Sequence, residues 1–243
     1  MTRPSRAASR AAPRAAKVIR AATRAPSRRH DYSSSTRRTL VACATELFTE
    51  RGYAGTSLDE VVAAAQVTKG ALYHHYSGKQ ALFEAVFEAT EDEAVQHITD
   101  EIQKVDDPWE RATVGVRAFM EVCQQPRFRR IVMQEGPVAL GFDRFREADE
   151  RNTYGLVRDI VDQVLRSYDV PAGIVETFTR VFYGAMTSAG MSVASAEDPE
   201  VAGREVETVI GIVLAGLRQL AESGVDLLDP ATSTPGRQES SSR

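Results

Sequence analysis

Residues 67–83, VTKGALYHHYSGKQALF, combine basic, hydroxyl-bearing and ring-bearing polar side chains and contain no acid. The chain as a whole is acidic, with 34 Asp and Glu against 30 Lys and Arg. Lysines, hydroxyls and backbone N–H groups bind phosphate oxygens, and polar rings can reach bases and sugars. An acid in such a segment would repel the phosphates of a nucleic acid. The composition therefore predicts a short segment that contacts double-stranded DNA.

The elements that position this segment can be predicted from helix periodicity and end signals. Apolar residues at helix spacing over 40–48 predict an amphipathic helix, which Gly52 ends. Ser57 and Glu60 have the spacing of a capping box and open a short helix over 57–65.

A third short helix and a long fourth one follow. Thr68 is placed to cap a helix over 69–75, and Ser77 with Gln80 has the spacing of a second capping box that opens the long helix. Two short helices joined by a tight turn form a helix-turn-helix, whose second helix enters the major groove of DNA. The acid-free segment is therefore predicted to be the reading helix.

The roles within the reading helix follow from residue type and position. Leu72 and Tyr76 lie at i and i+4 and are expected to pack inward. Gly70 lets the backbone approach the duplex closely, and hydroxyls at helix N-termini favour a phosphate. The expected DNA-contacting residues are Ser57, Thr68, Lys69, Gly70, Tyr73, His74, His75 and Lys79.

Residues 36–88, TRRTLVACATELFTERGYAGTSLDEVVAAAQVTKGALYHHYSGKQALFEAVFE, resemble the N-terminal domain of the TetR family of bacterial transcriptional repressors. The features that match are the LF…GY..TS run and the pattern VVAAAQVTKGALYHHYSGKQAL, in which Gln66 and Tyr76 depart from the family's frequent Gly and Phe. Residues 131–147, IVMQEGPVALGFDRFRE, also look like a segment from a subgroup of the family's regulatory domains. The resemblance implies a homodimer that places the helix over 69–75 of each subunit at one half of a palindromic operator. It also implies a small-molecule effector that releases the DNA.

Beyond residue 105 every long apolar pattern is helical, and the sequence shows no credible strand. The pattern is interrupted near Pro126 and at Gly136–Pro137. We predict an all-α fold in which a long helix joins an N-terminal helix-turn-helix domain to a C-terminal helical domain. The predicted segments are a disordered Arg/Ala-rich arm (1–35), the DNA-binding domain (36–88), the regulatory and dimerisation domain (89–228) and a disordered tail (229–243).

Aromatic rings and thioethers on the C-terminal helices predict a largely apolar cavity for a hydrophobic or aromatic small molecule. Tyr154, Asn152 and Arg117 are its candidate polar anchors, and small residues on two late helices suit close packing in a dimer. The candidate pocket residues are Phe119, Met120, Cys123, Met133, Phe142, Tyr154, Phe178 and Phe182, and the candidate interface residues are Gly184, Ser188, Thr208, Gly211 and Ala215.

Catalysis finds little support in the sequence, which lacks HExxH, GxSxG and GxGxxG. The adjacent His74 and His75 point about 100° apart on a helix and cannot share one metal ion. His97 lies on one helix face with Glu93 and Glu101, a pattern more typical of a solvated charged face than of a metal site. We expect no cofactor, no metal site and no catalysis, with an enzyme that uses the helical cavity as a remote alternative.

A second alternative is a nucleoid-type protein that coats DNA through its arm, because residues 1–38 carry eleven Lys and Arg and one acid. The sequence also leaves open whether residues 1–35 function at all or precede the true start of translation. Cys43 and Cys123 lack a paired motif and suit a reducing cytosol. Since no apolar run approaches the ~18–20 residues of a membrane span, we expect a cytoplasmic protein that joins the nucleoid when it binds DNA and has no membrane contact.

Overall fold

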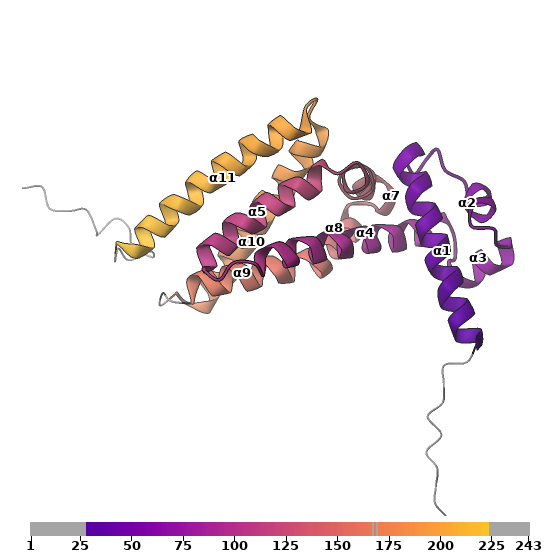
Figure 1. The fold of residues 1–243 in the computed structure, drawn as a ribbon, viewed down its shortest axis with the longest axis horizontal. Coiled ribbons are helices and arrows are strands. Elements are labelled where there is room, and N and C mark those ends of the chain that lie inside the picture. The colour runs from indigo at the N-terminus through magenta and orange to yellow at the C-terminus, as the bar shows by residue number, and fades with distance from the viewer. Residues whose placement is uncertain (1–27, 167, 169, 224–243) are drawn as a thin grey trace, which may run out of the picture.

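The structure is a computed structural model that describes residues 28–166, 168 and 170–223, without the side chains of residues 28–32 and 152. Every regular element in this part of the chain is a helix, which confirms the expected all-α fold (Figure 1). The elements are α1 (Arg28–Arg51), α2 (Leu58–Ala64), α3 (Lys69–His75), α4 (Lys79–Ile102), α5 (Pro108–Gln124), α6 (Pro126–Phe128), the π-helix η1 (Arg129–Glu135), α7 (Gly136–Leu140), α8 (Phe142–Asp149), the π-helix η2 (Glu150–Tyr154), α9 (Gly155–Leu165), α10 (Ala172–Ser195) and α11 (Pro199–Glu222).

Helices α1, α2 and α3 group at one end of the molecule around the start of α4 (Figure 1). Apolar side chains hold them together, since Leu40, Phe48, Leu72 and Phe83 are all fully buried. The rings of Phe48 and Phe83 meet edge to face with their centroids 5.2 Å apart, a geometry that aromatic pairs favour. The core of the small domain therefore includes the first turns of α4 and is continuous with the core of the C-terminal helices.

Helix α4 runs out of this group and into the larger C-terminal group, so the two share one continuous helix of 24 residues (Figure 1). The predicted domain boundary between residues 88 and 89 falls inside this helix, which is the long joining helix expected from the sequence. No Pro or Gly interrupts it, so its ladder of backbone hydrogen bonds is unbroken.

Helix α1 begins at Arg28, which places residues 28–35 in the helix rather than in the predicted arm. The prediction was wrong there because few apolar residues mark this stretch. No Pro or Gly lies between Pro26 and Gly52, so nothing stops the helix from extending toward the N-terminus. The remaining arm (1–27) and the predicted tail (229–243) lie outside the described residues.

The start of α4 differs from the capping box expected from Ser77 and Gln80. The residue at the cap is Gly78, which offers no side-chain hydrogen bond. Gln80 instead donates from Nε2 to the carbonyl oxygen of Ala139, at 3.0 Å. The Gln80 side chain therefore bonds to a distant segment and not to the cap of its own helix. This hydrogen bond connects the start of α4 to α7.

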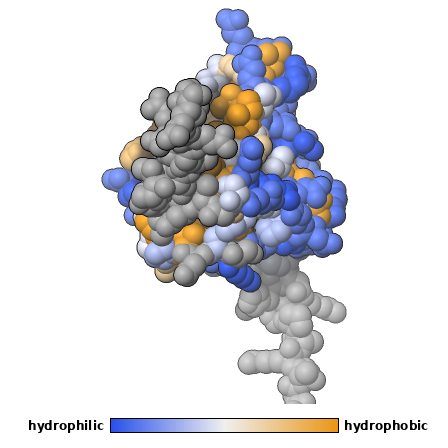
Figure 2. Space-filling model, turned by 90° about the vertical axis from the view of Figure 1, so that its left-hand side faces the viewer, coloured by the Kyte–Doolittle hydropathy of each residue, from blue (hydrophilic) through white to orange (hydrophobic). Residues whose placement is uncertain are grey.

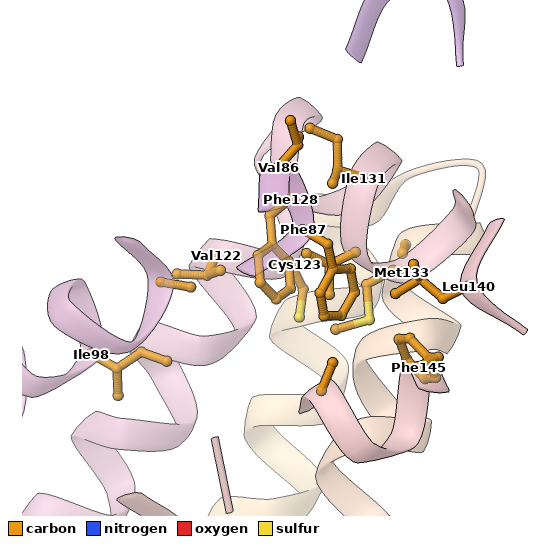
Figure 3. Close-up of a cluster of buried hydrophobic side chains, with 14 of the residues drawn as sticks. Val86, Phe87, Ile98, Val122, Cys123, Phe128, Ile131, Met133, Leu140 and Phe145 are labelled. Atoms are coloured by element: carbon orange, nitrogen blue, oxygen red, sulfur yellow. The ribbon is translucent and has the colours of Figure 1, made fainter. Parts of the chain in front are cut away.

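The C-terminal group consists of α5, α9, α10 and α11, in which α5 packs against α4 and also contacts α9, α10 and α11, with α6 to η2 at the junction (Figure 1). Figure 3 shows part of its core, where Phe87 of α4 lies near Phe145 of α8 and Phe128 of α6. Gly190 brings α10 close to α5, because a Cβ atom there would stand 3.0 Å from both Cys123 Sγ and Phe119 Cζ. Among the described helices none is both long and apolar enough to cross a membrane.

Candidate DNA-binding surface and ligand cavity

The end of α1 and the start of α2 are fixed by hydrogen bonds of the kind expected from the sequence. Gly52 adopts a φ of +73° and donates its N–H to the carbonyl oxygen of Phe48. Ser57 Oγ accepts from the N–H of Glu60, whose carboxylate accepts from the N–H of Ser57, so the capping box is confirmed. The backbone hydrogen bond to Ser57 is the largest cause of the lowered pKa of Glu60.

The turn between α2 and α3 contains the only residue other than glycine with positive φ among the described residues, Gln66 at +53°. Gln66 is the position at which the resembling TetR-type sequences often have Gly. Thr68 then caps α3 by accepting from the N–H of Ala71 at 3.1 Å, as predicted. These two residues fix the direction in which α3 leaves the turn.

Helix α3 buries one face and presents the other to solvent. Leu72 is 0 % exposed and Tyr76 is buried, whereas Tyr73 is 58 % exposed and His74 is exposed. A side chain added at Gly70 would meet only Thr68 Oγ1, at 3.8 Å, so the backbone there is open to an approaching surface. The face that a DNA duplex would meet is therefore polar and accessible.

The two lysines beside this face already have weak partners. Lys69 Nζ lies 2.7 Å from Asp59 Oδ1 across the turn, and this pair raises the pKa of Lys69. Lys79 Nζ lies 4.5 Å from the centroid of the Tyr53 ring. Exposed pairs of this kind contribute at most ~1 kcal/mol, so a phosphate can replace the partner.

His75 lies partly covered at the edge of α3. Partial burial is the first cause of the lowered pKa of His75, and the positive charges of His74 and Arg37 add to it. Because a lowered pKa favours the neutral imidazole, His75 contributes less positive charge to the surface than a lysine does. Its ring stacks at an angle against Tyr76, with centroids 6.4 Å apart.

Two apolar cavities lie between the C-terminal helices. The inner cavity, about 60 Å³, is bounded by side chains of α4, α5, α6, α8, α9 and α10 together with η1 and η2. The outer cavity, about 310 Å³, lies among α5, α9, α10 and α11. Ala112, Ile160 and Phe182 form walls of both cavities, so the two are neighbours.

Comparison with known families covers both the small domain and the cavity region. The family model for bacterial regulatory proteins of the tetR family matches residues 40–86. A second model, for the tetracyclin repressor-like C-terminal domain, matches residues 109–217. The chain belongs to the TetR family of bacterial transcriptional regulators. Proteins of this family are DNA-binding transcriptional regulators.

Individual TetR-family relatives agree with this assignment. The HTH-type transcriptional regulator SrpR of Pseudomonas putida is 22 % identical over 190 residues, which cover 77 % of this chain and 87 % of SrpR. The TetC protein of transposon Tn10 from Escherichia coli is 47 % identical over 53 residues, which cover 22 % of this chain and 27 % of TetC. A crystal structure of a TetR-family transcriptional regulator from Pectobacterium atrosepticum superposes with a TM-score of 0.67 at 29 % identity, covering 77 % of this chain and 96 % of that chain.

Several residues predicted for the TetR-type ligand pocket do lie at the cavities. Phe119, Met133 and Phe182 line the inner cavity, and Phe178 joins Phe182 at the outer one. These side chains come from α5, η1 and α10, whose apolar faces converge.

Other predicted pocket residues lie elsewhere. Met120 and Cys123 are buried but line neither cavity. Phe142 is 71 % exposed, because it starts α8 directly after Gly141 on the outer surface. Tyr154 lines neither cavity, and its hydroxyl donates to Glu176 at 2.8 Å.

The sequence also predicted two further polar anchors for the pocket, Arg117 and Asn152. Arg117 pairs with Glu207 on the surface, with Nε and Oε1 2.7 Å apart. The side chain of Asn152 lies outside the described residues. Helix periodicity places a side chain on a face, but the partner on the neighbouring helix decides whether it points into the cavity.

Sequence reasoning missed the polar residues that line the inner cavity, which are Glu91, Asp149, Thr153, Tyr183 and Thr187. A signal for Glu91 was present, since it follows Phe87 by four residues on the buried stripe of α4. Asp149 likewise follows Phe145 by four residues on the buried face of α8. An acid at a position that the helix period places on the buried face indicates a polar group in the interior of the fold.

Asp149 is held in this apolar surrounding by hydrogen bonds. The hydroxyl of Tyr183 donates to Asp149 Oδ2, and the side chains of Glu91 and Thr187 also hydrogen-bond to Asp149. Burial raises the pKa of Asp149 in spite of these bonds, and burial together with the charge of Asp149 raises the pKa of Tyr183.

The small residues predicted for a dimer interface lie on outer faces of α10 and α11. Neither Gly184 nor Gly211 has an atom within 4 Å of an added Cβ, so neither mediates packing within the subunit. Ser188, Thr208 and Ala215 are exposed. Large apolar side chains surround them, and the exposed ones include Val181, Val209, Ile212 and Val213.

Proposed function

We propose that the protein is a sequence-specific repressor that binds a palindromic operator as a homodimer and is released from it by a small, largely apolar effector. The observation that carries this proposal is the continuity of α4. Its first residue, Lys79, follows the reading helix α3 after three residues. Twelve residues later on the same helix, Glu91 lines the inner cavity.

Base reading is assigned to α3. Its outer face carries Tyr73, His74 and Lys69 without an acid, and Gly70 leaves the backbone open. Ser57, Thr68, His75 and Lys79 complete the proposed contacts, mainly with phosphates. Helix-turn-helix proteins place such residues at base edges in the major groove.

The dimer is assigned to the outer faces of α10 and α11. Val181 and Ile212 are each 68 % exposed there, beside Gly184 and Ala215. Apolar residues of this size gathered on one surface mark a protein interaction site. Figure 2 views the molecule from the end where α11 finishes and shows hydrophobic surface between hydrophilic residues.

The effector signal is assigned to the contact between the cavity region and the start of α4. Asp149 ends α8, α8 follows α7 directly after Gly141, and Ala139 of α7 accepts the hydrogen bond from Gln80 of α4. A ligand that displaces α8 therefore acts on the helix that carries α3.

The decisive experiment selects bound fragments from a random DNA pool with purified full-length protein and sequences them. We expect an enriched inverted repeat, because two-fold symmetric dimers bind symmetric half-sites. The competing nucleoid-type function predicts no enrichment and equal competition by bulk DNA. Removal of residues 1–27, which leaves α1 intact, should lower affinity for all sequences and flatten the salt dependence while the enriched repeat persists.

The dimer is tested with one pair of variants in α10. Gly184→Arg should give monomers that no longer hold the repeat, whereas Gly173→Arg, on the first turn of the same helix, should remain dimeric. Both positions are exposed and have no neighbouring atom within 4 Å of an added Cβ. Light scattering at micromolar concentration measures the outcome, and a dimeric Gly184→Arg variant would contradict the proposed interface.

A further inference from the structure

The inner cavity has two carboxyl groups in its wall. Glu91 of α4 is 1 % exposed and Asp149 of α8 is 8 % exposed, and both line the cavity. Most of the remaining wall consists of alanine, valine, isoleucine, leucine, phenylalanine and methionine side chains. Acids are rarely this buried, because a charge removed from water costs several kcal/mol unless it is compensated.

The groups that act on Asp149 are acidic or neutral. Asp149 accepts hydrogen bonds from Tyr183 and Thr187 and shares one with Glu91. The ionisable and polar groups that act on its carboxyl are Tyr183, Glu91, Glu150 and Thr187, and none of them is basic. A hydrogen bond between two carboxyls requires a proton between them. While that proton is held, the pair carries at most one negative charge.

This arrangement selects among ligands by charge. An anionic ligand would meet the negative charge of the pair in a low-dielectric surrounding, where like charges repel strongly. A neutral apolar ligand would fill space but leave the buried charge as it is. An ammonium group can replace the shared proton, pair with the carboxylates and donate hydrogen bonds to them.

The size of the two cavities limits the shape of the ligand. The inner cavity, about 60 Å³, is smaller than the ~150 Å³ apolar cavity that accepts benzene in an engineered protein. It holds a head group but no bulky ring. The outer cavity, about 310 Å³, adjoins it at Ile160 and Phe182 and reaches the partly exposed Ile174 and Leu220. A slender apolar chain can follow this path.

We propose that the protein binds an organic ammonium cation with a slender apolar chain, placing the ammonium group between Glu91 and Asp149 and the chain through the outer cavity. This inference rests on the proposed function, since it names the effector class of that same cavity. It also gives the two acids a role that packing alone would not require.

Proton release is the chemical signature of this binding mode. The ammonium displaces the proton that Glu91 and Asp149 share, so one proton leaves for each cation bound. The other titratable groups that interact with Asp149 are Tyr183 of α10, Glu150 of η2 and Cys123 of α5. Burial raises the pKa of both Tyr183 and Cys123, which keeps these two neutral over the working range. Affinity for the cation should therefore rise with pH, approaching tenfold per pH unit where one proton is released.

The test uses three probes with the same chain, octylammonium, octan-1-ol and octanoate, titrated into the full-length protein by calorimetry. We expect octylammonium to bind at least tenfold more tightly than octan-1-ol, and octanoate to bind more weakly still. Titrations in buffers of different ionisation enthalpy should show about one proton released per octylammonium. Equal affinity for the alcohol and the ammonium, or no proton release, would overturn the proposal.

Matched variants locate the effect on α4. Glu91→Gln should remove the preference for octylammonium over octan-1-ol, and Asp149→Asn should do the same. Asp92→Asn changes the next residue, which is exposed, and should leave the preference unchanged. If the Glu91→Gln variant still prefers octylammonium to octan-1-ol, the proposed ammonium site is contradicted. If both cavity variants fail to fold, the probe series and the proton count on the wild-type protein decide.

A last measurement separates this inference from the proposed function. Operator binding is followed by fluorescence anisotropy with each probe. If no inverted repeat is selected, the proposed function fails even when octylammonium binds with proton release. If the repeat is bound and a neutral ligand releases it while octylammonium neither binds nor releases it, the repressor function stands and the ammonium site is wrong.

Discussion

Helix α2, which precedes α3, and the wall of the inner cavity each contain an acid held by a neighbouring polar group, in opposite surroundings. Asp59 and Lys69 lie 2.7 Å apart with side chains 66 % and 63 % exposed. Glu91 and Asp149 are buried, and a hydrogen bond with the side chain of Glu91 acts on the Asp149 carboxyl. Water screens the first pair, so its partners exchange easily for a phosphate. The second pair is not screened, so it discriminates among the groups that enter the cavity.

The largest expected effect tests the same difference between a buried and an exposed environment on two neighbouring residues of α3. Leu72→Ala should destabilise the protein by about 3–5 kcal/mol, because it leaves a cavity in a fully buried site. Tyr73→Ala should leave stability nearly unchanged, since the side chain is largely exposed. Urea denaturation monitored by circular dichroism measures both, and similar losses would mean that α3 is packed differently.

The DNA-binding side of the contrast is sharpened by the lysines. Tyr73→Ala and Lys69→Ala should each weaken binding to the selected operator by about 1–3 kcal/mol. Lys79→Ala should weaken binding to all DNA sequences alike. It should also reduce the slope of log affinity against log salt concentration, as loss of a phosphate contact does. Anisotropy titrations at three salt concentrations decide, and an unchanged operator affinity for Tyr73→Ala would refute the placement of the reading helix.

The buried side of the contrast predicts a pH effect. The pKa of Asp149 is raised in the folded state, so the folded protein binds more protons than the unfolded one above the ordinary carboxyl pKa of about 3.9. Stability should therefore fall as pH rises from that value toward the raised pKa, by about 1.4 kcal/mol per unit of difference. Asp149→Asn should flatten this decline. Melting curves between pH 4 and 8 measure it, with Asp92→Asn as the exposed control.

The smallest expected effect concerns the turn that aims α3. Gln66 occupies a left-handed backbone conformation that costs a side-chain-bearing residue roughly 1–2 kcal/mol. Gln66→Gly should relieve this strain and, after the added freedom of the unfolded chain, stabilise the protein by about 0.5–1 kcal/mol. Operator affinity should stay the same. A lower melting temperature would show that the glutamine side chain contributes a contact that outweighs the strain.

Local signals in the sequence predicted much of the small domain. Ser57 and Glu60 formed the expected capping box, and Thr68 capped α3. Such contacts join residues three apart, so the sequence contains both partners. The prediction of a second capping box from Ser77 and Gln80 was wrong, because Gln80 donates a hydrogen bond to Ala139, 59 residues away. The bounds of α1 were wrong for a related reason, since helix can continue without an apolar face.

The cavity was less predictable because several helices build it. Phe119, Met133 and Phe182 were expected there and line it, but Phe142 lies on the surface. Whether a ring faces a cavity or solvent depends on neighbouring elements that the local pattern does not specify. The acids Glu91 and Asp149 were not predicted, because an acid on one helix does not show which side chains of other helices will surround it.

The unbroken course of α4 also sets how much movement the protein needs. At about 1.5 Å rise per residue, the twelve residues from Lys79 to Glu91 span about 18 Å. A rotation of roughly 5° about the Glu91 end would shift the Lys79 end by about 1.5 Å over this length. That distance exceeds the tolerance of a hydrogen bond, whose donor and acceptor lie about 2.7–3.2 Å apart. Under the proposed function, a tilt no larger than ordinary helix packing adjustments would therefore be enough to take α3 out of register with base edges.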